Sequence, residues 1–344
     1  MGKKNDTLCS YLAIPEVFAD CINGCCFGGK RSISAEQLSE CSQIIYGGMT
    51  GTRSRDVVKG VCNGRQYAII GIEGQDKVHQ AMPLRCLEYD MKQYREQLRL
   101  LRQKNLAEDK TARWESQTDN SENDRRKLSD AEFLSGIRDG EKLNPVITIV
   151  LYHGNIPYNG CLRLRDMLDL EKENQIFEPF VADYKMNLVT FDKLDESKFT
   201  TGFRELTGFM KRIQNRDELM KYRDENKERI SRLDEETYTA ISVLTGHKKL
   251  LKNKEKYRED GGYNMCKGMK DWEEFAKEEG KKEGKKEGKK EGIEKGLKKG
   301  KAEGEFGMLY ELVKDGAITL EYAAAKKNLT VNKFQKELEK LQII

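Results

Sequence analysis

Residues 56–75 constrain the fold of this chain more than any other stretch. The run at 67–72 is apolar and rich in β-branched side chains, which is typical of a buried strand. Residues 56–59 read as a second strand, and Asn63-Gly64 between the two is a hairpin turn signal. The sequence therefore predicts an antiparallel hairpin within a sheet.

Polar side chains mark the ends of this predicted hairpin. Asp56 begins the first strand, while Glu73 and Gln75 end the second, two residues apart and so on the same face. Two converging carboxylates beside a polar neighbour suit an oxygen-seeking cation such as Mg²⁺. The alternative is a solvated strand end, where acidic residues are common.

An ordered series of motifs around the hairpin resembles a known nuclease group. Asp56, Glu73 and Gln75 are similar to the D…(D/E)-x-K core of the PD-(D/E)XK nuclease superfamily, with Gln75 in place of Lys and Arg55 in place of Pro. More narrowly, the chain resembles the Rpn/YhgA-like recombination-promoting nucleases and transposases up to about residue 215. The likeness rests on FADCIN at 18–23, RDVVK at 55–59, GIEGQ at 71–75, VHQAMPLR at 78–85, PVITIVLYHG at 145–154 and LRDML at 164–168.

The resemblance implies an α/β fold, a restriction-endonuclease-like mixed sheet flanked by helices, and Mg²⁺-dependent hydrolysis of DNA phosphodiesters. Asp56, Glu73 and the carbonyl of Gly74 would bind the metal, and Gln75 would orient the attacking water. Gln75 offers only a dipole where the consensus Lys offers a positive charge. The alternative is a catalytically weak or inactive DNA-binding or assembly protein that keeps the fold.

Four further side chains are candidates to support this site, each with a structural alternative. The resemblance implies that Asp20, on an N-terminal helix, leans toward the metal; otherwise it is a helix-surface aspartate. His79, one turn beyond Gln75, is within reach of a phosphate or is a structural donor. Arg85 contacts the DNA backbone or forms a surface ion pair. His153 follows a predicted buried strand at 146–152, and loops at strand ends collect ligands.

The chain divides by composition into a core and a charged C-terminal part. Helical spacing from residue 77 to 103 predicts a helix that Pro83 kinks or interrupts. Residues near 104–130 are polar and read as a flexible, partly helical insertion. The expected order is a nuclease core at 6–215, a charged helical extension at 216–276, a Gly-Lys-Glu linker at 277–305 and a small helical unit at 306–344.

The linker and the tail each admit two interpretations. Glycine recurs every fourth residue from Gly280 to Gly304, at about 1 kcal/mol per glycine relative to alanine, so a solvated linker is favoured over a self-associating helix. In the tail, Thr319 and Thr330 are candidate N-caps of two short helices. The pair resembles a DNA-binding helix-turn-helix, but a hairpin for dimerisation or capping is favoured because the second helix lacks arginine. A homo-oligomer would form through these C-terminal helices.

Composition excludes several classes of protein. The chain has 37% hydrophobic and 35% charged residues with a net charge of +4, so any DNA contact relies on local patches. Nine cysteines lack the spacing of a disulfide framework or a zinc site, although Cys21, Cys25 and Cys26 cluster, and free thiols in the cytoplasm are expected. The polar N-terminus is not a signal peptide, and no apolar run is long enough to cross a membrane.

Overall fold

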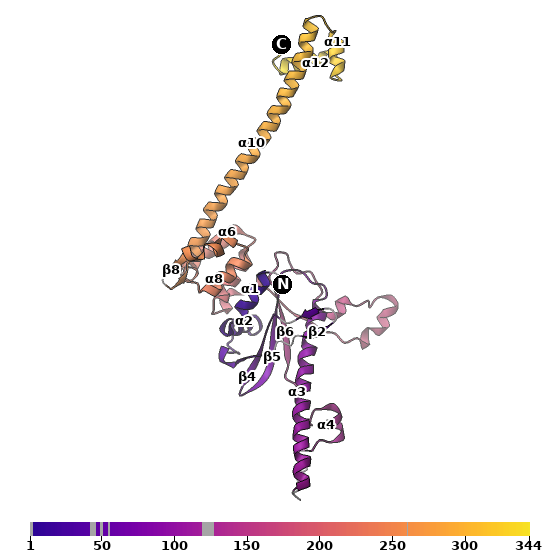
Figure 1. Ribbon diagram of the computed structural model, residues 1–344, viewed down its shortest axis with the longest axis vertical. Coiled ribbons are helices and arrows are strands. Elements are labelled where there is room, and N and C mark those ends of the chain that lie inside the picture. Colours follow the sequence, from indigo (N-terminus) through magenta and orange to yellow (C-terminus); the bar gives the residue numbers. More distant parts are fainter. Residues whose placement is uncertain (1–2, 42–45, 49–50, 54–55, 119–126, 260) are drawn as a thin grey trace. The chain divides into compact units, whose positions relative to one another are not determined.

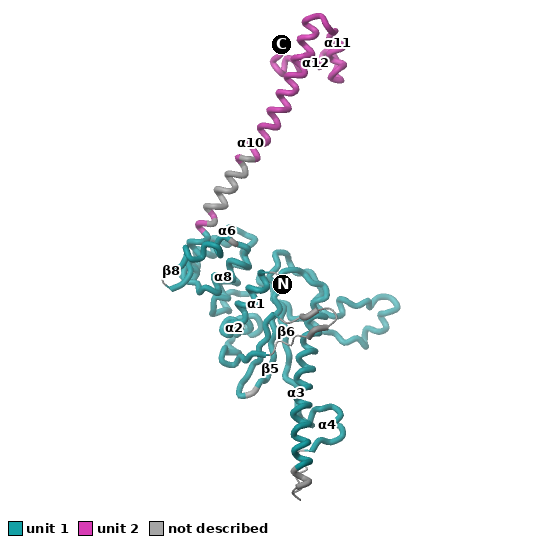
Figure 2. The backbone as a smooth tube through the Cα atoms, viewed as in Figure 1, with its two compact units in different colours: residues 1–269 teal, residues 270–344 magenta. Residues whose placement is uncertain are grey.

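The computed structural model describes residues 3–41, 46–48, 51–53, 56–118, 127–259 and 261–344. These residues form two compact units, residues 1–269 and residues 270–344 (Figure 2). Arg55 and the part of the polar insertion at 119–126 lie outside the described residues.

A five-stranded mixed sheet forms the centre of the first unit, in the order β1-β4-β5-β6-β7 (Figure 1). The α/β fold class expected from the sequence is thus confirmed. β4 pairs antiparallel with both β1 and β5, whereas β6 runs parallel to β5 and β7 runs parallel to β6. The strands are β1 Leu38–Glu40, β4 Val57–Asn63, β5 Arg65–Gln75, β6 Val146–Tyr152 and β7 Asn187–Thr190. Two further pairs are short: β2 Tyr46–Gly48 with β3 Gly51–Arg53, and β8 Arg258–Glu259 with β9 Gly262–Tyr263.

The predicted hairpin is present as β4 and β5. Gly64 joins the two strands with a φ of 74°, a left-handed conformation that glycine adopts without steric cost. The predicted buried strand is β6, whose residues are all buried except Ile147. Because β5, β6 and β7 are parallel, their carboxyl ends lie along one edge of the sheet, and Gln75, Tyr152 and Thr190 end the three strands.

Helices cover both faces of this sheet. Along β5, Ile69 packs in a cluster that includes Tyr94 of α3 (Met82–Thr118), and Glu73 on the same face contacts Arg85 of α3. Side chains alternate between faces along a strand, so Gly74 lies on the opposite face, where Leu8 of α1 (Lys3–Leu12) packs against it. The hairpin is therefore enclosed between α1 and α3.

α3 differs from the sequence expectation at both ends. It begins at Met82, so Pro83 lies in its first turn and neither kinks nor interrupts it. A proline there removes no intrahelical hydrogen bond, because the first N–H groups of a helix have no partner within it. The helix also continues through the first part of the polar insertion to Thr118, and α4 (Asp130–Ser135) follows.

The charged extension packs on the N-terminal helices. α8 (Glu235–Leu244) contacts α1, and the Tyr11 hydroxyl lies 2.9 Å from that of Thr237. Residues 216–269 accordingly fall in the same compact unit as the sheet, which differs from the separate extension that composition suggested.

The other helices are α2 Pro15–Phe27, α5 Phe203–Arg212, α6 Arg216–Glu225, α7 Lys227–Ile230 and α9 Lys248–Lys252. Short 3₁₀ helices are η1 Ala35–Gln37, η2 Leu164–Met167, η3 Lys172–Phe180, η4 Phe191–Lys193, η5 Glu196–Lys198 and η6 Lys254–Tyr257.

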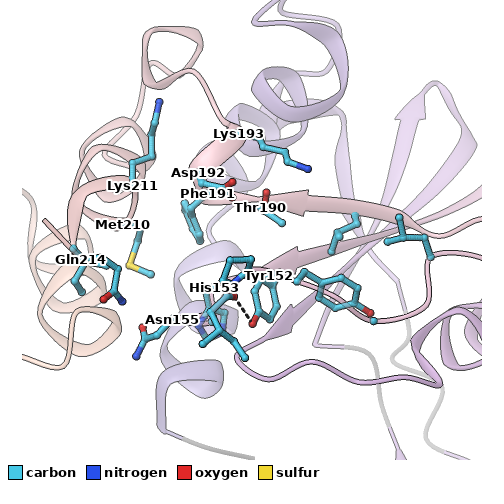
Figure 3. A pocket seen from close by; sticks show the side chains of 18 residues that line it. Tyr152, His153, Asn155, Thr190, Phe191, Asp192, Lys193, Met210, Lys211 and Gln214 are labelled. Atoms are coloured by element: carbon cyan, nitrogen blue, oxygen red, sulfur yellow. Dashed lines mark hydrogen bonds between the residues drawn. The ribbon is translucent and has the colours of Figure 1, made fainter.

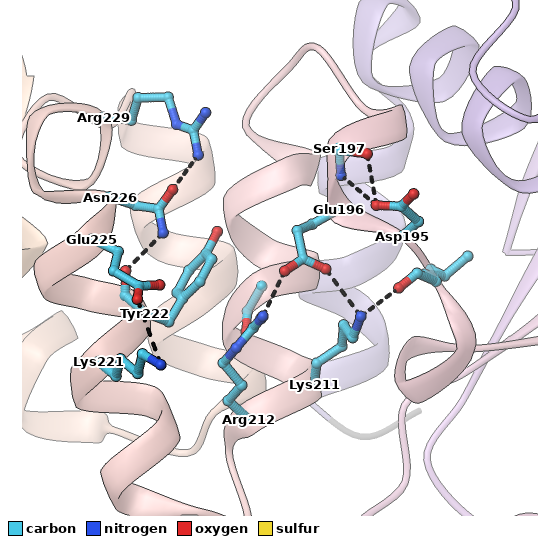
Figure 4. A network of polar contacts seen from close by, with 12 residues as sticks. Asp195, Glu196, Ser197, Lys211, Arg212, Lys221, Tyr222, Glu225, Asn226 and Arg229 are labelled. Atoms are coloured by element: carbon cyan, nitrogen blue, oxygen red, sulfur yellow. Dashed lines mark hydrogen bonds and ion pairs between the residues drawn. The ribbon is translucent and has the colours of Figure 1, made fainter.

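A polar network ties α5 to the segment before it (Figure 4). Glu196 accepts hydrogen bonds from Lys211 Nζ at 3.0 Å and from Arg212 Nη2 at 2.6 Å, and Lys211 also donates to the carbonyl of Leu194. Burial acts to raise the pKa of Glu196, but its backbone hydrogen bond and these two cations lower it to about 2. The Arg212 guanidinium also lies 4.4 Å from the centroid of the Tyr222 ring.

The Gly-Lys-Glu repeat is helical, not a coil linker. α10 runs from Met265 to Lys314 without interruption, and the second unit begins within it. Its first residues belong to the first unit, where Met265 and Met269 are buried, so the helix extends from a folded start and avoids the cost of nucleation. Ion pairs one turn apart support it further along: Lys295–Glu291, Lys298–Glu294 and Lys299–Glu303.

The tail forms the expected small helical unit. α11 (Leu320–Lys326) begins at Thr319, whose hydroxyl accepts a hydrogen bond from the N–H of Tyr322, and α12 (Val331–Lys340) begins at Thr330. Ala323, Ala324, Phe334 and Leu338 are buried between them, as expected. The end of α10 completes this core, with Phe306 stacked on Phe334 at 5.2 Å between ring centroids.

The remaining composition-based expectations concern cysteines and membranes. No disulfide joins any of the nine cysteines, all of which lie within the described residues. Cys21 and Cys25 approach to 4.0 Å between sulfurs, but no group of three or more Cys, His, Asp or Glu side chains suited to a metal occurs in the described parts of the chain. No helix of the described residues is both long and apolar enough to span a membrane.

Candidate active site

The hairpin register brings Asp56 and Glu73 together. Val57 pairs with Ile72, so Asp56 just before β4 lies beside Glu73 of β5. The backbone N–H of Asp56 donates to Oε1 of Glu73 at 3.3 Å. Glu73 is 1% exposed, which places a carboxylate almost entirely out of water. The sequence predicts that Asp56 and Glu73 lie close together, and the structure confirms this proximity.

The Asp56 carboxylate has one satisfied and one unsatisfied oxygen. Oδ2 accepts a 2.8 Å hydrogen bond from the backbone N–H of Gly74, whereas Oδ1 is buried and has no hydrogen-bond partner among the described residues. Burial raises the pKa of Asp56, and the Gly74 N–H and the positive charge of Arg85 act against that rise. A Cβ at Gly74 would lie 3.2 Å from Leu8 and 3.5 Å from Asp56 Oδ2, so a side chain there would crowd the carboxylate.

Arg85 balances the buried charge of Glu73. Its Nη2 lies 2.9 Å from Glu73 Oε2, and its Nε donates to the Tyr89 hydroxyl at 2.9 Å. The Arg85 side chain is 20% exposed, so the ion pair is mostly shielded from solvent. Of the two roles considered for Arg85, an ion pair is present, but it is formed inside the site and not on the surface.

Helix α1 supplies side chains that sequence reasoning did not assign. Asn5 donates from Nδ2 to the carbonyl of Gly74 at 3.0 Å, and its Oδ1 lies 2.8 Å from Nε2 of His153. Cys9, one turn later, lies beside Asp56; burial and then the Asp56 charge raise the pKa of its thiol. The spacing of Asn5 and Cys9 places them on one helical face, which is the signal that could have pointed to α1.

The structure links His153 to the candidate site through Asn5. The N–H of His153 donates to the Gln75 carbonyl at 2.9 Å, which fixes the end of β6 against the end of β5. Burial lowers the pKa of His153 to about 4, so the imidazole is neutral at physiological pH. Asn5 presents an oxygen to the ring, and therefore Nε2 carries the proton of the neutral form.

Gln75 is buried at the end of β5 but bonds to the turn that follows. Its Nε2 donates to the carbonyl of Lys77 at 2.9 Å, and no hydrogen bond joins its side chain to Asp56 or Glu73 in the described structure. The geometry places Gln75 next to the carboxylates, with its amide engaged by backbone.

The two other predicted side chains lie in different surroundings. Asp20 accepts five hydrogen bonds from the backbone and hydroxyl groups of Thr200 and Thr201, just before α5, and none of these joins it to Asp56 or Glu73. That arrangement joins α2 to α5. His79 lies in the turn before α3, where its Nδ1 is buried without a hydrogen-bond partner.

Comparison with protein families bears on this architecture. Residues 133–239 match the model of the family described as "Putative transposase, YhgA-like". The resemblance to the YhgA-like group is confirmed. This YhgA-like segment includes β6, β7, α5 and His153, whereas Asp56, Glu73 and Gln75 precede it. No curated protein and no solved structure matches the chain.

The residues around Asp56 fit a divalent cation in part. Asp56 Oδ1 is a buried anionic oxygen without a partner, and Gly74 adds a carbonyl next to it, both of the hard oxygen type that Mg²⁺ prefers. Glu73 already interacts with Arg85, so a cation would share or replace that contact. The end of the hairpin thus provides two carboxylates and a carbonyl, with an arginine that competes for one of them.

Proposed function

We propose that this chain is a Mg²⁺-dependent DNA endonuclease with its active site at the end of the β4–β5 hairpin. The observation that carries the proposal is the buried, unpartnered Oδ1 of Asp56 beside the buried carboxylate of Glu73. A buried anionic oxygen is costly unless a cation or donor compensates it. A family of transposase type is compatible with cleavage of DNA. A cytoplasmic location is part of the same proposal.

Asp56, Glu73 and the Gly74 carbonyl would hold the cation. When bound, it would supply polarisation of a phosphate oxygen and a water of lowered pKa. The Gly74 N–H holds Oδ2 of Asp56 in place, and Asn5 fixes the Gly74 carbonyl, so the protein orients both groups before a ligand enters. Until then Glu73 is paired with Arg85 in its buried position.

In this proposal Gln75 orients the attacking water. It has no charge to offer, so its contribution is a dipole directed by its position on the face of β5 that carries Glu73. To reach a water in the site, its amide has to leave the carbonyl of Lys77. Asp20, His79 and Arg85 were expected to assist; of these, Arg85 contacts Glu73 directly.

A second function is favoured by one observation. The Glu73–Arg85 pair already neutralises one of the two proposed metal ligands, as a protein that has lost its metal would require. The second candidate is therefore a weak or inactive nuclease that binds DNA or assembles on it.

Cleavage of supercoiled plasmid with Mg²⁺, and with EDTA as the blank, tests the proposal. Wild type should nick the plasmid only with the cation. Loss of an outer-shell partner of a metal typically lowers activity by about 10–100-fold. Glu73→Gln removes a proposed metal ligand itself, so it should lower the cleavage rate by more than that. The matched control is Glu205→Gln, because Glu205 is also buried and paired with an arginine, Arg229, but lies on α5.

Two results would count against the endonuclease. Cleavage by Glu73→Gln at the wild-type rate would remove Glu73 from the mechanism. Wild type that shifts DNA in a mobility assay but never cleaves it with Mg²⁺ would establish the binding protein in its place.

A further inference from the structure

A pocket of about 390 Å³ opens at the carboxyl ends of β6 and β7 (Figure 3). Its walls come from the loop after β6, the end of β7 with η4, and the last turn of α5. The volume lies in the range of about 300–1,000 Å³ that is usual for small-molecule sites. The edge formed by carboxyl ends of parallel strands is also where α/β sheets collect ligands.

Two buried polar side chains in this wall have an atom without a hydrogen bond. His153 is 3% exposed and its Nδ1 has no partner; Thr190 is 7% exposed and its Oγ1 has none. Leaving such groups unsatisfied is costly, so native proteins rarely do it without a reason. Two in the lining of one pocket indicate that the pocket receives a polar partner.

The protonation of His153 defines what that partner must offer. Asn5 donates from Nδ2 to the Gly74 carbonyl, so its oxygen faces the ring and Nε2 of His153 must be the donor between them. Nδ1 of the neutral ring is then a lone-pair acceptor, which a ligand N–H group would satisfy. The Thr190 hydroxyl can donate or accept. Each of the two groups thus offers one hydrogen bond to a ligand.

The remaining wall suits a flat, apolar body with a charged end. Ile156, Phe191 and Met210 line the pocket, and the Tyr152 hydroxyl donates to the carbonyl of Ile156, which holds the loop closed against the strand. At the rim, Lys193 is exposed and forms no ion pair within the described chain, while Asp192 beside it is also exposed. Lysine is a common partner of phosphate.

We propose that this pocket binds a nucleobase, either of a free nucleotide or of a nucleotide turned out of a bound DNA strand. A base combines a flat body with donors and acceptors along its edges, so it suits the apolar wall and offers hydrogen-bond partners to both polar groups. The unpartnered atoms are shielded from solvent, so entry requires a small side-chain rotation, which is common on binding. The pocket lining does not include Asp56 or Glu73, although Asn5 joins His153 to the Gly74 carbonyl, and base binding does not depend on cleavage.

Calorimetric titration with the four deoxynucleoside monophosphates, in EDTA so that no cleavage occurs, tests base binding. Wild type should bind at least one of them saturably. Thr190→Val keeps the shape of the side chain but removes the hydroxyl, and it should weaken binding about five- to tenfold. Thr207→Val is the matched control, since Thr207 is also buried with an unpartnered hydroxyl but does not line the pocket.

A second pair of variants blocks the pocket without touching the core. Ile156 at the mouth is 61% exposed, so Ile156→Trp should fold and close the entrance, which abolishes binding. Ile176 is 70% exposed and lies outside the pocket, so Ile176→Trp should bind as wild type does. Thermal unfolding followed by circular dichroism verifies that each variant is folded.

An oligonucleotide that carries 2-aminopurine distinguishes the two sources of the base. A rise in its fluorescence on binding in EDTA, abolished by Ile156→Trp but kept by Ile176→Trp, assigns the pocket to a base turned out of DNA. Binding of a free nucleotide without that rise assigns it to a free nucleotide. The proposal is overturned if wild type binds neither, or if folded Thr190→Val and Ile156→Trp bind both ligands as wild type does. Plasmid cleavage can fail or succeed independently of either result.

Discussion

The guanidinium of Arg85 lies 2.9 Å from a carboxylate oxygen of Glu73 that is almost completely buried. The pair joins the first turns of α3 to the end of β5, next to the unsatisfied oxygen of Asp56. Two carboxylates and one arginine thus share a small volume that water hardly reaches. The charge of this cluster decides both the stability of the site and its response to a cation.

Replacing Arg85 should destabilise the protein and make it depend on a divalent cation. In Arg85→Gln the buried Glu73 loses its ionic partner, and breaking a buried pair costs about 3–5 kcal/mol. A cation at Asp56 and Glu73 would replace the lost charge, so Mg²⁺ should raise the unfolding temperature of the variant more than that of wild type. Differential scanning fluorimetry at neutral pH, with and without Mg²⁺, measures the difference.

Arg229→Gln is the control for this comparison. Arg229 Nε lies 2.9 Å from Glu205, which is also buried, so the variant should also lose stability. Mg²⁺ should not restore it. Equal responses of the two variants to Mg²⁺ would show that the cation acts elsewhere.

Asp56→Asn should stabilise the protein at neutral pH although it removes a proposed ligand. Burial raises the pKa of Asp56 above its ordinary value of 3.8, so the folded protein binds that proton more strongly than the unfolded chain. The contribution of Asp56 to the free energy of unfolding is therefore fully present below about pH 3.8. It is lost as the pH rises through the pKa of Asp56 in the folded protein. Asparagine avoids this loss, and its oxygen can still accept from the Gly74 N–H.

Urea unfolding of both proteins between pH 4 and pH 7 measures this effect. The free energy of unfolding of Asp56→Asn should exceed that of wild type at pH 7, and the excess should shrink toward pH 4. An asparagine variant less stable than wild type at pH 7 would show that the Asp56 charge is well compensated without a cation.

Local patterns in the sequence were sufficient to predict the hairpin and the approach of its two carboxylates. The apolar run of β5, the turn at Gly64 and the period of two determine which residues share a face, and none of this requires tertiary information. The buried strand β6 could be predicted equally well, because parallel strands covered on both faces are continuously apolar. The tail core, from Ala323 to Leu338, followed from helical spacing and its caps.

The partners of these residues could not be predicted, because they depend on how distant elements pack. Asn5 reaches the Gly74 carbonyl only because α1 lies on the sheet, a contact that spans 69 residues of sequence. Asp20 reads as a candidate ligand until Thr200 and Thr201, 180 and 181 residues away, are seen to donate hydrogen bonds to its oxygens. The repeat was misjudged for another reason: glycine propensity describes an isolated helix, whereas α10 continues from a folded end.

Gln75→Lys tests the assignment of the hairpin core. Lysine at this position restores the superfamily consensus and adds a positive charge near the reacting phosphate, so cleavage should be kept or increased, whereas Gln75→Ala should slow it. The Gln75 side chain lies at the end of β5, where only the bond to the Lys77 carbonyl has to be given up. Plasmid nicking rates decide it, and loss of cleavage in a folded Gln75→Lys protein would mean that the site requires an amide.

Glu196 should contribute to stability at neutral pH and lose that contribution in acid. Its pKa of about 2 lies below the ordinary value of 4.5. The contribution of Glu196 to the free energy of unfolding is therefore fully present above pH 4.5 and is lost as the pH falls toward 2. Glu196→Gln should therefore unfold more easily at pH 7 and show a shallower loss of stability between pH 4.5 and pH 2. Glu228→Gln, an exposed glutamate of α7, is the control. Parallel acid curves for Glu196→Gln and wild type would contradict the role of this network.

The glycines of the repeat should tolerate large side chains without a change of oligomeric state. A Cβ at Gly288 or Gly292 meets no atom of the described chain within 4 Å, so the helix itself has room for leucine. Each substitution also improves helix propensity by up to about 1 kcal/mol. If the glycine line packed against a second helix, leucine would force the backbones apart while alanine would largely be accommodated. Analytical ultracentrifugation of Gly288→Leu/Gly292→Leu and of the double alanine variant should therefore give the wild-type species in both. A smaller species for leucine alone would assign the repeat to self-association, and the C-terminal helices would then be the oligomer interface.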